Sequence, residues 1–437
     1  MFHEYRRRVY RGAKIGLILA GASLLPSCMA SNGNAQSAAA TVPAESMAEK
    51  VTRIHDSALV LDAHADIVLP ETSKTYLASD GLSKVHPSKL RTGKVDAVVM
   101  SVAVGPGPRT AKGDAAAKTE ANAKLAAAIK LANQNDDIVI EATAQEIKAA
   151  TKAGKKVLIL GFQNARSLSG NIDEIDRYYK SGVRIFGLNH LGHNDFSDSS
   201  RPIYIAEKKG YEVTEEHKGL SKLGVAAVQR INALGGLVDV SQMSKAATMQ
   251  ATRVSSAPVI ASHSNIRALS NVSRNLSDAE IDLIGLRGGV IHIASFGAYL
   301  VDLSDPNLLA SIKKVRLDHD LPEAYSYPYE LYWEIPDLKK RTSFLMAMRD
   351  TIGTGSIDRM IDHIDYVVKR IGIDHVGIGT DFNHGGGIAG FTDASEAENV
   401  TAGLIKRGYN EAQISKIWSG NFLRALAEAE RIGGTKN

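Results

Sequence analysis

The chain has 437 residues, of which 44% are hydrophobic, so it is long enough to bury a large core. Its single cysteine, Cys28, excludes an intramolecular disulfide. The formal net charge is +4, but residues 1–28 hold five basic residues and one acid and contribute all of it. The rest of the chain is near neutral, which argues against nucleic acid as a partner.

Residues 1–28 have the pattern of an export signal. A basic cluster precedes an apolar run, residues 15–25, that is too short to span a bilayer. Cys28 follows this run as in a lipoprotein signal, which predicts a lipid anchor at Cys28. The alternative is cleavage within the alanine-rich stretch 35–40, which would give a soluble periplasmic protein. Residues 29–46 are rich in Ala, Ser, Asn and Gly, so we expect a flexible tether.

Residues 47–437 are expected to form one domain in which short apolar segments alternate with helical patterns. Eight segments have the β-branched, largely apolar composition of strands that are covered on both faces. They are Ala58–Asp66, Val95–Val104, Lys156–Asn164, Val183–Asn194, Gly235–Met243, Pro258–Ser264, Gly289–Phe296 and His375–Phe382.

Stretches with a period of 3.6 residues lie between these segments, for example Lys118–Asn133, Leu220–Leu234 and Ile357–Ile371. Eight strands that alternate with helices predict an α/β fold, a (β/α)8 TIM barrel, rather than an open doubly wound sheet. No GxGxxG motif follows the first segment, which argues against a dinucleotide site. Two stretches without periodicity, near 194–217 and 318–341, are expected to be inserted loops. The second is rich in aromatic residues and is expected to form a lid or a subunit contact.

The first predicted strand ends in Leu61-Asp62-Ala63-His64-Ala65-Asp66. Side chains two residues apart on a strand point to the same side, so His64 and Asp66 should project together. The carboxyl ends of the strands form the active-site face of a TIM barrel. An imidazole and a carboxylate at this place suit a divalent metal ion or a polarised water.

Polar residues also follow several other predicted strands. Because unpaired buried polar groups are costly, this pattern indicates a shared cavity rather than core packing. The residues are Gln163, Asn164, Asn189, His190, Asp239, Ser241, Gln242, Ser262, His263, Ser264, Thr380 and Asp381.

Seven segments, in this order and spacing, resemble the membrane (renal-type) dipeptidase family of amidohydrolase-like barrels. They are LDAHAD (61–66), SGVRIFGLNHLGHN (181–194), GLSKLG (219–224), LGGLVDVSQ (234–242), SHSNIRALSNVSRN (262–275), HVGIGTDF (375–382) and GNFLRAL (420–426). The resemblance covers roughly residues 50–430. It implies a barrel of the metallo-dependent hydrolase type, hydrolysis of dipeptides with the help of zinc, and a homodimer.

The resemblance also implies roles for residues of this chain. His64 and Asp66 would bind the first metal ion, and His263 would bind the second. His190 would hold or polarise the substrate carbonyl. Asp381 would lie beside the attacking water and pass its proton to the leaving amine, so His190 and Asp381 are the expected catalytic residues.

Arg274 would bind a substrate carboxylate, for which its planar guanidinium is suited. An ion pair between Arg274 and Asp278 is the alternative.

Two positions depart from the family, and both are metal-ligand positions. Gln163 stands where the family has a glutamate that bridges the metal ions, and Gln242 stands where it has a histidine on the second ion. An amide offers one neutral oxygen and cannot bridge two cations as a carboxylate does. With only Asp66 and Asp381 as anions, a site with two zinc ions is unfavourable.

The sequence therefore predicts a hydrolase that cleaves a dipeptide or small amide with one zinc ion, to which Gln163 and Gln242 could contribute. One alternative is that dipeptidase activity tolerates both glutamines. Another is a metal-free barrel that binds a small peptide-like ligand or carries out non-hydrolytic acid/base chemistry. His193 or His384 could also replace a lost ligand, although both are expected to be exposed on loops.

Overall fold

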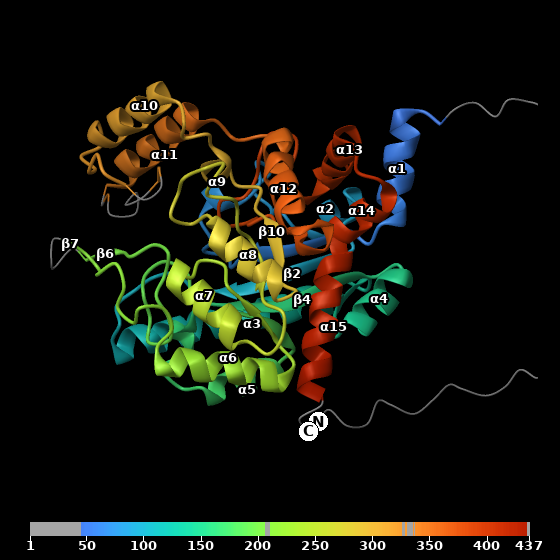
Figure 1. The fold of residues 1–437 in the computed structure, drawn as a ribbon, viewed down its shortest axis with the longest axis horizontal. Helices are drawn as coiled ribbons and strands as arrows, with labels where there is room; N and C mark the ends of the chain where they lie inside the picture. The colour runs from blue at the N-terminus through green and yellow to red at the C-terminus, as the bar shows by residue number, and fades with distance from the viewer. Residues whose placement is uncertain (1–44, 206–209, 326–327, 330–334, 336, 435–437) are drawn as a thin grey trace, which may run out of the picture. The chain divides into compact units, whose positions relative to one another are not determined.

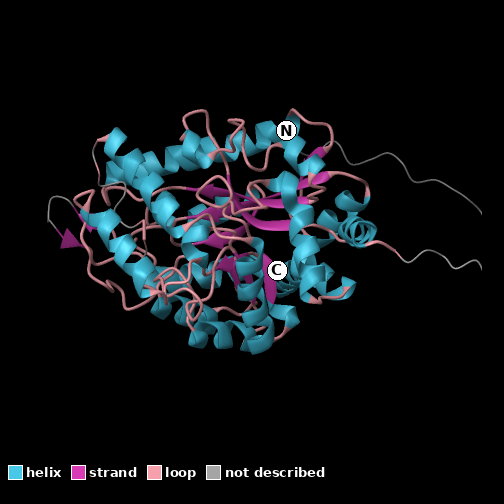
Figure 2. Ribbon diagram, turned by 90° about the horizontal axis from the view of Figure 1, so that it is seen from above, coloured by secondary structure: helices cyan, strands magenta, loops and turns pink. Residues whose placement is uncertain are grey.

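Eight parallel strands form a closed barrel at the centre of the structure. The computed structural model describes residues 45–205, 210–325, 328–329, 335 and 337–434. In barrel order the strands are β1 (Leu61–Asp66), β2 (Ala97–Ala103), β4 (Lys156–Gln163), β5 (Val183–Gly187), β8 (Leu237–Asp239), β9 (Ile260–Ala261), β10 (Val290–Ile293) and β11 (Val376–Ile378). Each lies within one of the eight predicted segments, and helices surround them (Figure 2).

The barrel closes between β1 and β11. The N–H of Asp66 donates to the carbonyl of Phe382 at 2.9 Å, and the N–H of Asp381 donates to the carbonyl of His64 at 3.0 Å. The buried carboxylate of Asp62 accepts from the N–H and the hydroxyl of Thr380, at 2.8 and 2.6 Å. These contacts confirm a (β/α)8 barrel and exclude an open sheet.

Helices cover the outside of the barrel (Figure 1). They are α1 (Met47–Ser57), α2 (Pro87–Thr92), α3 (Ala111–Asn133), α4 (Ala144–Lys152), α5 (Asp173–Lys180), α6 (Lys222–Leu234), α7 (Lys245–Val254), α8 (Asp278–Leu286), α12 (Ile357–Ile371), α13 (Ala397–Arg407) and α14 (Glu411–Ser415). The three predicted helical stretches correspond to α3, α6 and α12. Helix α6 shows why its bounds fall where they do, because Ser221 caps its first turn and Gly235, at φ +85°, ends it.

The amino ends of the strands enclose an apolar core. Side chains near these ends, such as Leu61, Val99 and Ile159, form one cluster with Phe422 and Leu426 of helix α15 (Asn421–Gly434). A second cluster lies between the strands and the outer helices. Helix α15 thus covers the amino ends of the strands. Polar side chains gather at the opposite, carboxyl ends, where the loops are long.

Two insertions lie beside this carboxyl face. The stretch 194–217 contains a short hairpin of β6 (Tyr204–Ile205) and β7 (Gly210–Tyr211). The second insertion is more helical than the sequence suggested, because α11 (Leu338–Ile352) begins inside the predicted loop 318–341 and packs against α10 (Pro306–Leu317).

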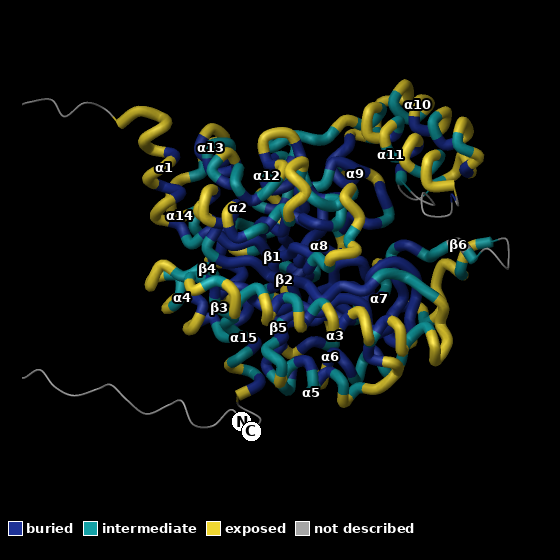
Figure 3. Tube along the Cα trace, turned by 180° about the vertical axis from the view of Figure 1, so that it is seen from behind, coloured by how far each residue is buried: buried dark blue, intermediate teal, exposed yellow. Residues whose placement is uncertain are grey.

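Helices α10 and α11 share a small core of their own, which includes Ile312, Phe344 and Met348. Their outer faces are exposed, in contrast to the buried strands (Figure 3). Of the aromatic residues in this insertion, Tyr325 and Tyr329 are described, whereas Tyr327, Tyr332 and Trp333 lie outside the described residues.

One further strand lies outside the barrel order given above. Strand β3 (Ile138–Ile140), which the sequence did not predict, pairs with the outer part of β4. None of the helices in the described ranges is long and apolar enough to cross a membrane. The predicted export signal and most of the predicted tether, residues 1–44, lie outside the described residues.

Candidate active site

The end of β1 brings His64 and Asp66 together, as their spacing predicted. Both are buried, and His64 Nε2 lies 3.3 Å from Asp66 Oδ1. The other carboxylate oxygen of Asp66 lies 3.1 Å from Nδ1 of His384. Burial alone would raise the pKa of Asp66, but His384 and then His64 hold it well below its ordinary value. Burial also opposes protonation of His64, yet the carboxylate of Asp66 raises the pKa of this imidazole.

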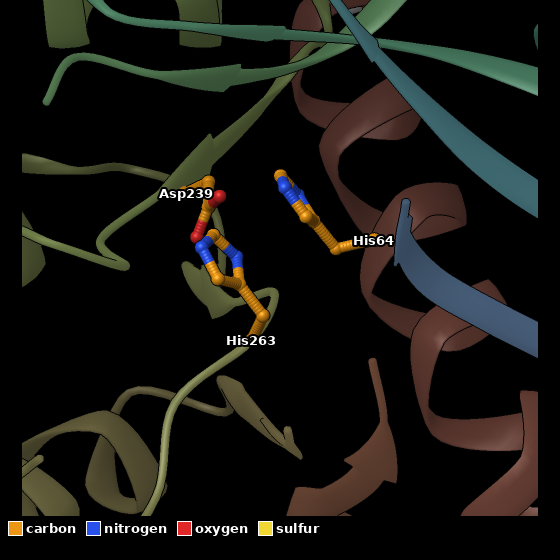
Figure 4. Close-up of side chains that lie close together, drawn as sticks. All are labelled: His64, Asp239 and His263. Atoms are coloured by element: carbon orange, nitrogen blue, oxygen red, sulfur yellow. The ribbon is translucent and has the colours of Figure 1, made fainter. Parts of the chain in front are cut away.

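His263, at the end of β9, stacks on His64 with ring centroids 3.7 Å apart (Figure 4). Asp239, at the end of β8, completes a buried group whose ligand atoms lie within 4.8 Å of one another. Its oxygens already accept hydrogen bonds from the N–H of Ser241, the N–H of Ser262 and the hydroxyl of Ser262, at 2.9, 2.9 and 2.6 Å. We therefore assign Asp239 to positioning its neighbours rather than to binding an ion.

The hydroxyl of Ser262 determines which nitrogen of His263 carries hydrogen. Because it donates to Asp239, it must accept from His263 Nδ1, which lies 2.7 Å away. Nε2 of His263 is then an acceptor. Burial, followed by the charges of His64 and Arg274, keeps the pKa of His263 well below its usual value, so the ring is neutral.

Both glutamines at metal-ligand positions direct their amide nitrogens to this acceptor. Nε2 of Gln163 lies 3.3 Å and Nε2 of Gln242 lies 3.4 Å from His263 Nε2. The orientation of Gln242 is fixed from the other side, because its Oε1 accepts from the guanidinium of Arg201. The lone pair with which His263 would bind a metal ion is thus already used by two N–H donors.

The first metal position is different. His64 Nε2, Asp66 Oδ1 and Gln163 Oε1 are buried, and apart from the 3.3 Å contact between the first two, none of them has a hydrogen-bond partner among the described residues. A buried acceptor without a partner costs about 1–3 kcal/mol. A cation bound between His64 Nε2 and Asp66 Oδ1, which lie 3.3 Å apart, would satisfy both atoms. One nitrogen and two oxygens are suitable zinc ligands. The donor set therefore fits one metal ion at His64 and Asp66 but does not fit a second one at His263.

The two predicted catalytic residues lie on the same face as these ligands. Asp381, three residues after β11, adopts a left-handed backbone conformation, φ +59°, and burial raises the pKa of its carboxyl group. His190, after β5, stacks on His384 with centroids 4.7 Å apart. Burial, reinforced by His384 and Arg201, keeps the pKa of His190 well below its ordinary value.

Arg274 is buried beneath the mouth of the barrel, the opening at the carboxyl ends of its strands. Its guanidinium donates to Ser264 Oγ at 2.9 Å and to the carbonyl of His263 at 2.6 Å, and it lies 5.2 Å from the centre of the Tyr299 ring. The alternative ion pair with Asp278 is not formed, because Asp278 binds Arg370 and Tyr366. Arg274 Nε is buried and has no partner in the part of the chain that the structure describes, and Arg274 is not among the residues that line the cavity.

A cavity of about 320 Å³ opens above these residues. His190, Gln242, Asp381 and His384 contribute to its lining, together with three cationic side chains, Lys84, Arg201 and Arg349. Helix α11 and the short helix α9 (Gly297–Leu300) supply apolar and aromatic wall residues, which include Phe296, Tyr299, Tyr329, Leu345 and Met346.

The sequence patterns did not predict that three further residues, His384, Arg201 and Tyr299, lie at this mouth. His384 is a direct partner of Asp66 rather than an exposed loop residue. Arg201 comes from the aperiodic insertion, and Tyr299 lies three residues beyond the predicted seventh strand. The position of each after a strand end is the signal that could have drawn attention to them.

His193, in contrast, has a structural role. Its Nδ1 accepts from the N–H of Ser199 at 3.0 Å, and its Nε2 donates to the carbonyl of Val213 at 2.7 Å. Both ring nitrogens are therefore occupied in holding the insertion, and His193 is not placed to replace a metal ligand.

A closed parallel barrel with buried imidazole and carboxylate groups at its carboxyl face defines a hydrolase-type barrel of the metal-dependent class. A family model described as "Membrane dipeptidase (Peptidase family M19)" matches residues 48–437. The chain belongs to this family.

The chain is similar to several known members and barrels. A solved structure, the probable dipeptidase PvdM from Pseudomonas aeruginosa, has 32% identity and a TM-score of 0.78, and the match covers 88% of this chain and 99% of that one. Dipeptidase tcpJ of Claviceps purpurea is 27% identical over 67% of this chain and 56% of its own length. The chain thus spans little more than half of that curated relative.

A metallo peptidase from Rhodobacter sphaeroides, solved with a phosphinate mimic of the dipeptide L-Ala-D-Ala, shares the fold. Its identity is 18% and its TM-score 0.64, and the match covers 85% of this chain and 99% of that one.

Proposed function

We propose that this protein is an exported hydrolase that cleaves a dipeptide or a small amide with one zinc ion. The observation that carries the proposal is the contrast between the two metal positions. Buried atoms of His64, Asp66 and Gln163 have no hydrogen-bond partner among the described residues beyond the 3.3 Å contact between His64 and Asp66, whereas His263 Nε2 is already hydrogen-bonded to two amides.

When bound, zinc would act as a Lewis acid and lower the pKa of a water molecule from about 15.7 toward about 7. Asp381 would accept a proton and return it to the leaving amine, a role for which its raised pKa is suited. The neutral ring of His190 would hold the substrate carbonyl. Arg274 would bind the substrate carboxylate, as the family resemblance implies, through N–H groups that Ser264 and His263 do not use.

Dipeptide-like substrates are supported by the cavity and by the relatives. The cavity, about 320 Å³, has the size of a small-ligand site and carries three cationic side chains for an acidic ligand. Two of the relatives named above are called a dipeptidase and a probable dipeptidase, and the Rhodobacter sphaeroides metallo peptidase holds a dipeptide mimic. We extend this substrate class to the present chain.

Metal analysis of the purified protein with dipeptide hydrolysis assays tests the proposal. We expect one zinc ion per chain in the wild type and almost none in Asp66→Asn, because the amide removes the anionic ligand. Asp198→Asn is a matched control, since Asp198 is also buried but binds backbone N–H groups of its own insertion. Two zinc ions in the wild type would contradict the proposal.

A metal-free binding barrel is the second candidate. The observation that favours it is the 3.1 Å contact between His384 and Asp66, which can neutralise this carboxylate without a metal ion. A wild-type protein that contains no zinc after reconstitution, yet binds dipeptides, would establish this second candidate in place of the first.

We also propose that residues 1–28 direct export and that Cys28 carries a lipid anchor. The sequence pattern alone supports this part. Cell fractionation tests it, because Cys28→Ser should move the protein from the membrane fraction to the periplasmic fraction. Equal distribution of the two forms would argue for the alternative cleavage site within residues 35–40.

We also propose that the protein forms a homodimer, as the resemblance to the family implies. The mass of the purified protein in solution tests this proposal.

A further inference from the structure

We propose that Arg201 permanently supplies the positive charge that a second metal ion would bring to the mouth, and that Gln242 holds it there. This inference rests on the proposed one-zinc function and extends it. Arg201 and Gln242 would then act together as an electrostatic substitute for the ion, aimed at the carbonyl oxygen of the bound amide.

The backbone fixes Arg201 beside the strand ends. Its N–H donates to the hydroxyl of Ser199 at 3.2 Å, and this hydroxyl contacts the carbonyls of His190, at 2.6 Å, and Gln242, at 3.3 Å. The N–H of Ser200 also donates to the carbonyl of Gln242 at 2.9 Å. The insertion that carries Arg201 is thus attached directly to two residues of the active-site face.

The side chains form a continuous array of donors and acceptors. The guanidinium of Arg201 donates to Oε1 of Gln242, whose Nε2 faces the acceptor nitrogen of His263 at 3.4 Å. A second guanidinium nitrogen lies 3.4 Å from the hydroxyl of Tyr299. An amide is suited to this place because it accepts on one side and donates on the other. The presence of a glutamine at position 242 is therefore explained, because Gln242 links Arg201 to His263.

The charge of Arg201 opposes a second ion and lies at the cavity in which a ligand would bind. Arg201 is buried, with 5% of its surface exposed, and it lines the cavity together with His190 and Asp381. A divalent ion at His263 would lie one amide away from a fixed cation, in surroundings of low polarity where like charges repel strongly. The same charge can stabilise negative charge that develops on the carbonyl oxygen of a ligand.

The zinc content of a set of variants tests the inference. Q163E/Q242H restores both family ligands, but we expect it to bind only one zinc ion because Arg201 remains, held by the backbone contacts of Ser199 and Ser200 that do not involve the glutamine side chain. Adding Arg201→Met should raise the content to two, whereas adding Arg201→Lys should leave it at one because the charge is kept. Arg349→Met is the matched control, since Arg349 lines the same cavity but comes from helix α11. Added to Q163E/Q242H, it should also leave one ion.

Several outcomes would overturn the inference. They are two zinc ions in Q163E/Q242H with Arg201 intact, one ion in the triple variant with Arg201→Met, and equal contents in the Met and Lys triple variants. If Arg201→Met prevents folding, as judged by circular dichroism, the double variant still decides. A wild type with no zinc or two zinc ions would instead reject the proposed function itself, so the two failures are distinguishable.

Binding to the metal-free protein gives a second readout. After chelation, Arg201→Met should weaken the affinity for a phosphinate dipeptide mimic about tenfold, because a charge-assisted hydrogen bond is lost. Arg201→Lys should recover part of this loss. A change of less than about twofold for Arg201→Met would overturn the role of Arg201 toward the ligand.

Discussion

Single hydrogen atoms determine what the mouth of this barrel can bind. Ser262 and Asp239 place the hydrogen of His263 on Nδ1, which leaves Nε2 as an acceptor for the amides of Gln163 and Gln242. A glutamine is similar in size to a glutamate, but its N–H group points where a metal ion would need a lone pair. The second metal position therefore presents N–H donors where a metal ion needs lone pairs, although Gln163 differs little in shape from the family's glutamate.

Asp239 gives a prediction at this scale. If Asp239 positions Ser262 and His263, Asp239→Asn should keep one zinc ion per chain but lower the free energy of unfolding by about 1–3 kcal/mol, since its amide nitrogen would face an N–H donor. Metal analysis and urea unfolding measure the two quantities. Loss of zinc comparable to that in Asp66→Asn would show instead that Asp239 is a ligand.

At the scale of elements, buried polar contacts between helices and loops hold the active-site face in place. Helix α12 is an example, because its buried His363 accepts a hydrogen bond at Nδ1 from the N–H of Ile266, in the loop that follows β9. Burial, aided by Arg359, lowers the pKa of His363 to about 3. The loop from β9 to α8 thus depends on a neutral imidazole in α12.

The pH dependence of stability follows from this contact. The pKa of His363 is lower in the folded chain than the ordinary value of about 6.5, so its contribution is complete above that pH and is lost as the pH falls toward 3. Between pH 6.5 and 4.5 the wild type should lose about 2–3 kcal/mol more than His363→Asn, whose amide oxygen can accept from Ile266 but cannot titrate. Urea unfolding at several pH values measures the difference, and parallel curves would contradict this account.

At the scale of the whole molecule, the helical insertion is built as an attachment to the barrel. Its entry and exit lie side by side, because Gly297 and Gly355 are so close that a Cβ atom on Gly355 would lie 3.2 Å from Gly297 Cα. Between them, α10 and α11 have a separate small core, and α11 supplies one wall of the cavity. The insertion therefore shapes the ligand site without contributing to the predicted zinc ligands.

Removal of this insertion tests that division. A variant with residues 302–352 replaced by a short Gly-Ser linker should still fold cooperatively and bind one zinc ion, because the barrel core lies elsewhere. Its KM for dipeptides should rise at least about tenfold, since Leu345, Met346 and Arg349 are lost from the cavity wall. Unchanged KM, or loss of zinc, would show that the insertion has a different role.

The sequence predicts the barrel better than the mouth. The eight strands are recognisable because both of their faces are buried, and the spacing of His64 and Asp66 follows from strand geometry. Helices α10 and α11 were missed because each buries only two side chains in the described part of the chain, which leaves little periodicity. The position of Arg201 depends on irregular turns, and the orientation of the glutamine amides depends on partners far away in the sequence.

The joining of the first and last strands also bears on the order of events during synthesis and folding. Asp66 and Asn383 share a hydrogen bond although 317 residues separate them, and the backbone of His64 is paired with Asp381. Contacts of such long sequence separation form late, because a large loop must close first. The strand that carries His64 and Asp66, the two proposed zinc ligands, pairs on one side only when the end of the barrel arrives, so metal uptake should follow rather than guide the assembly of the chain.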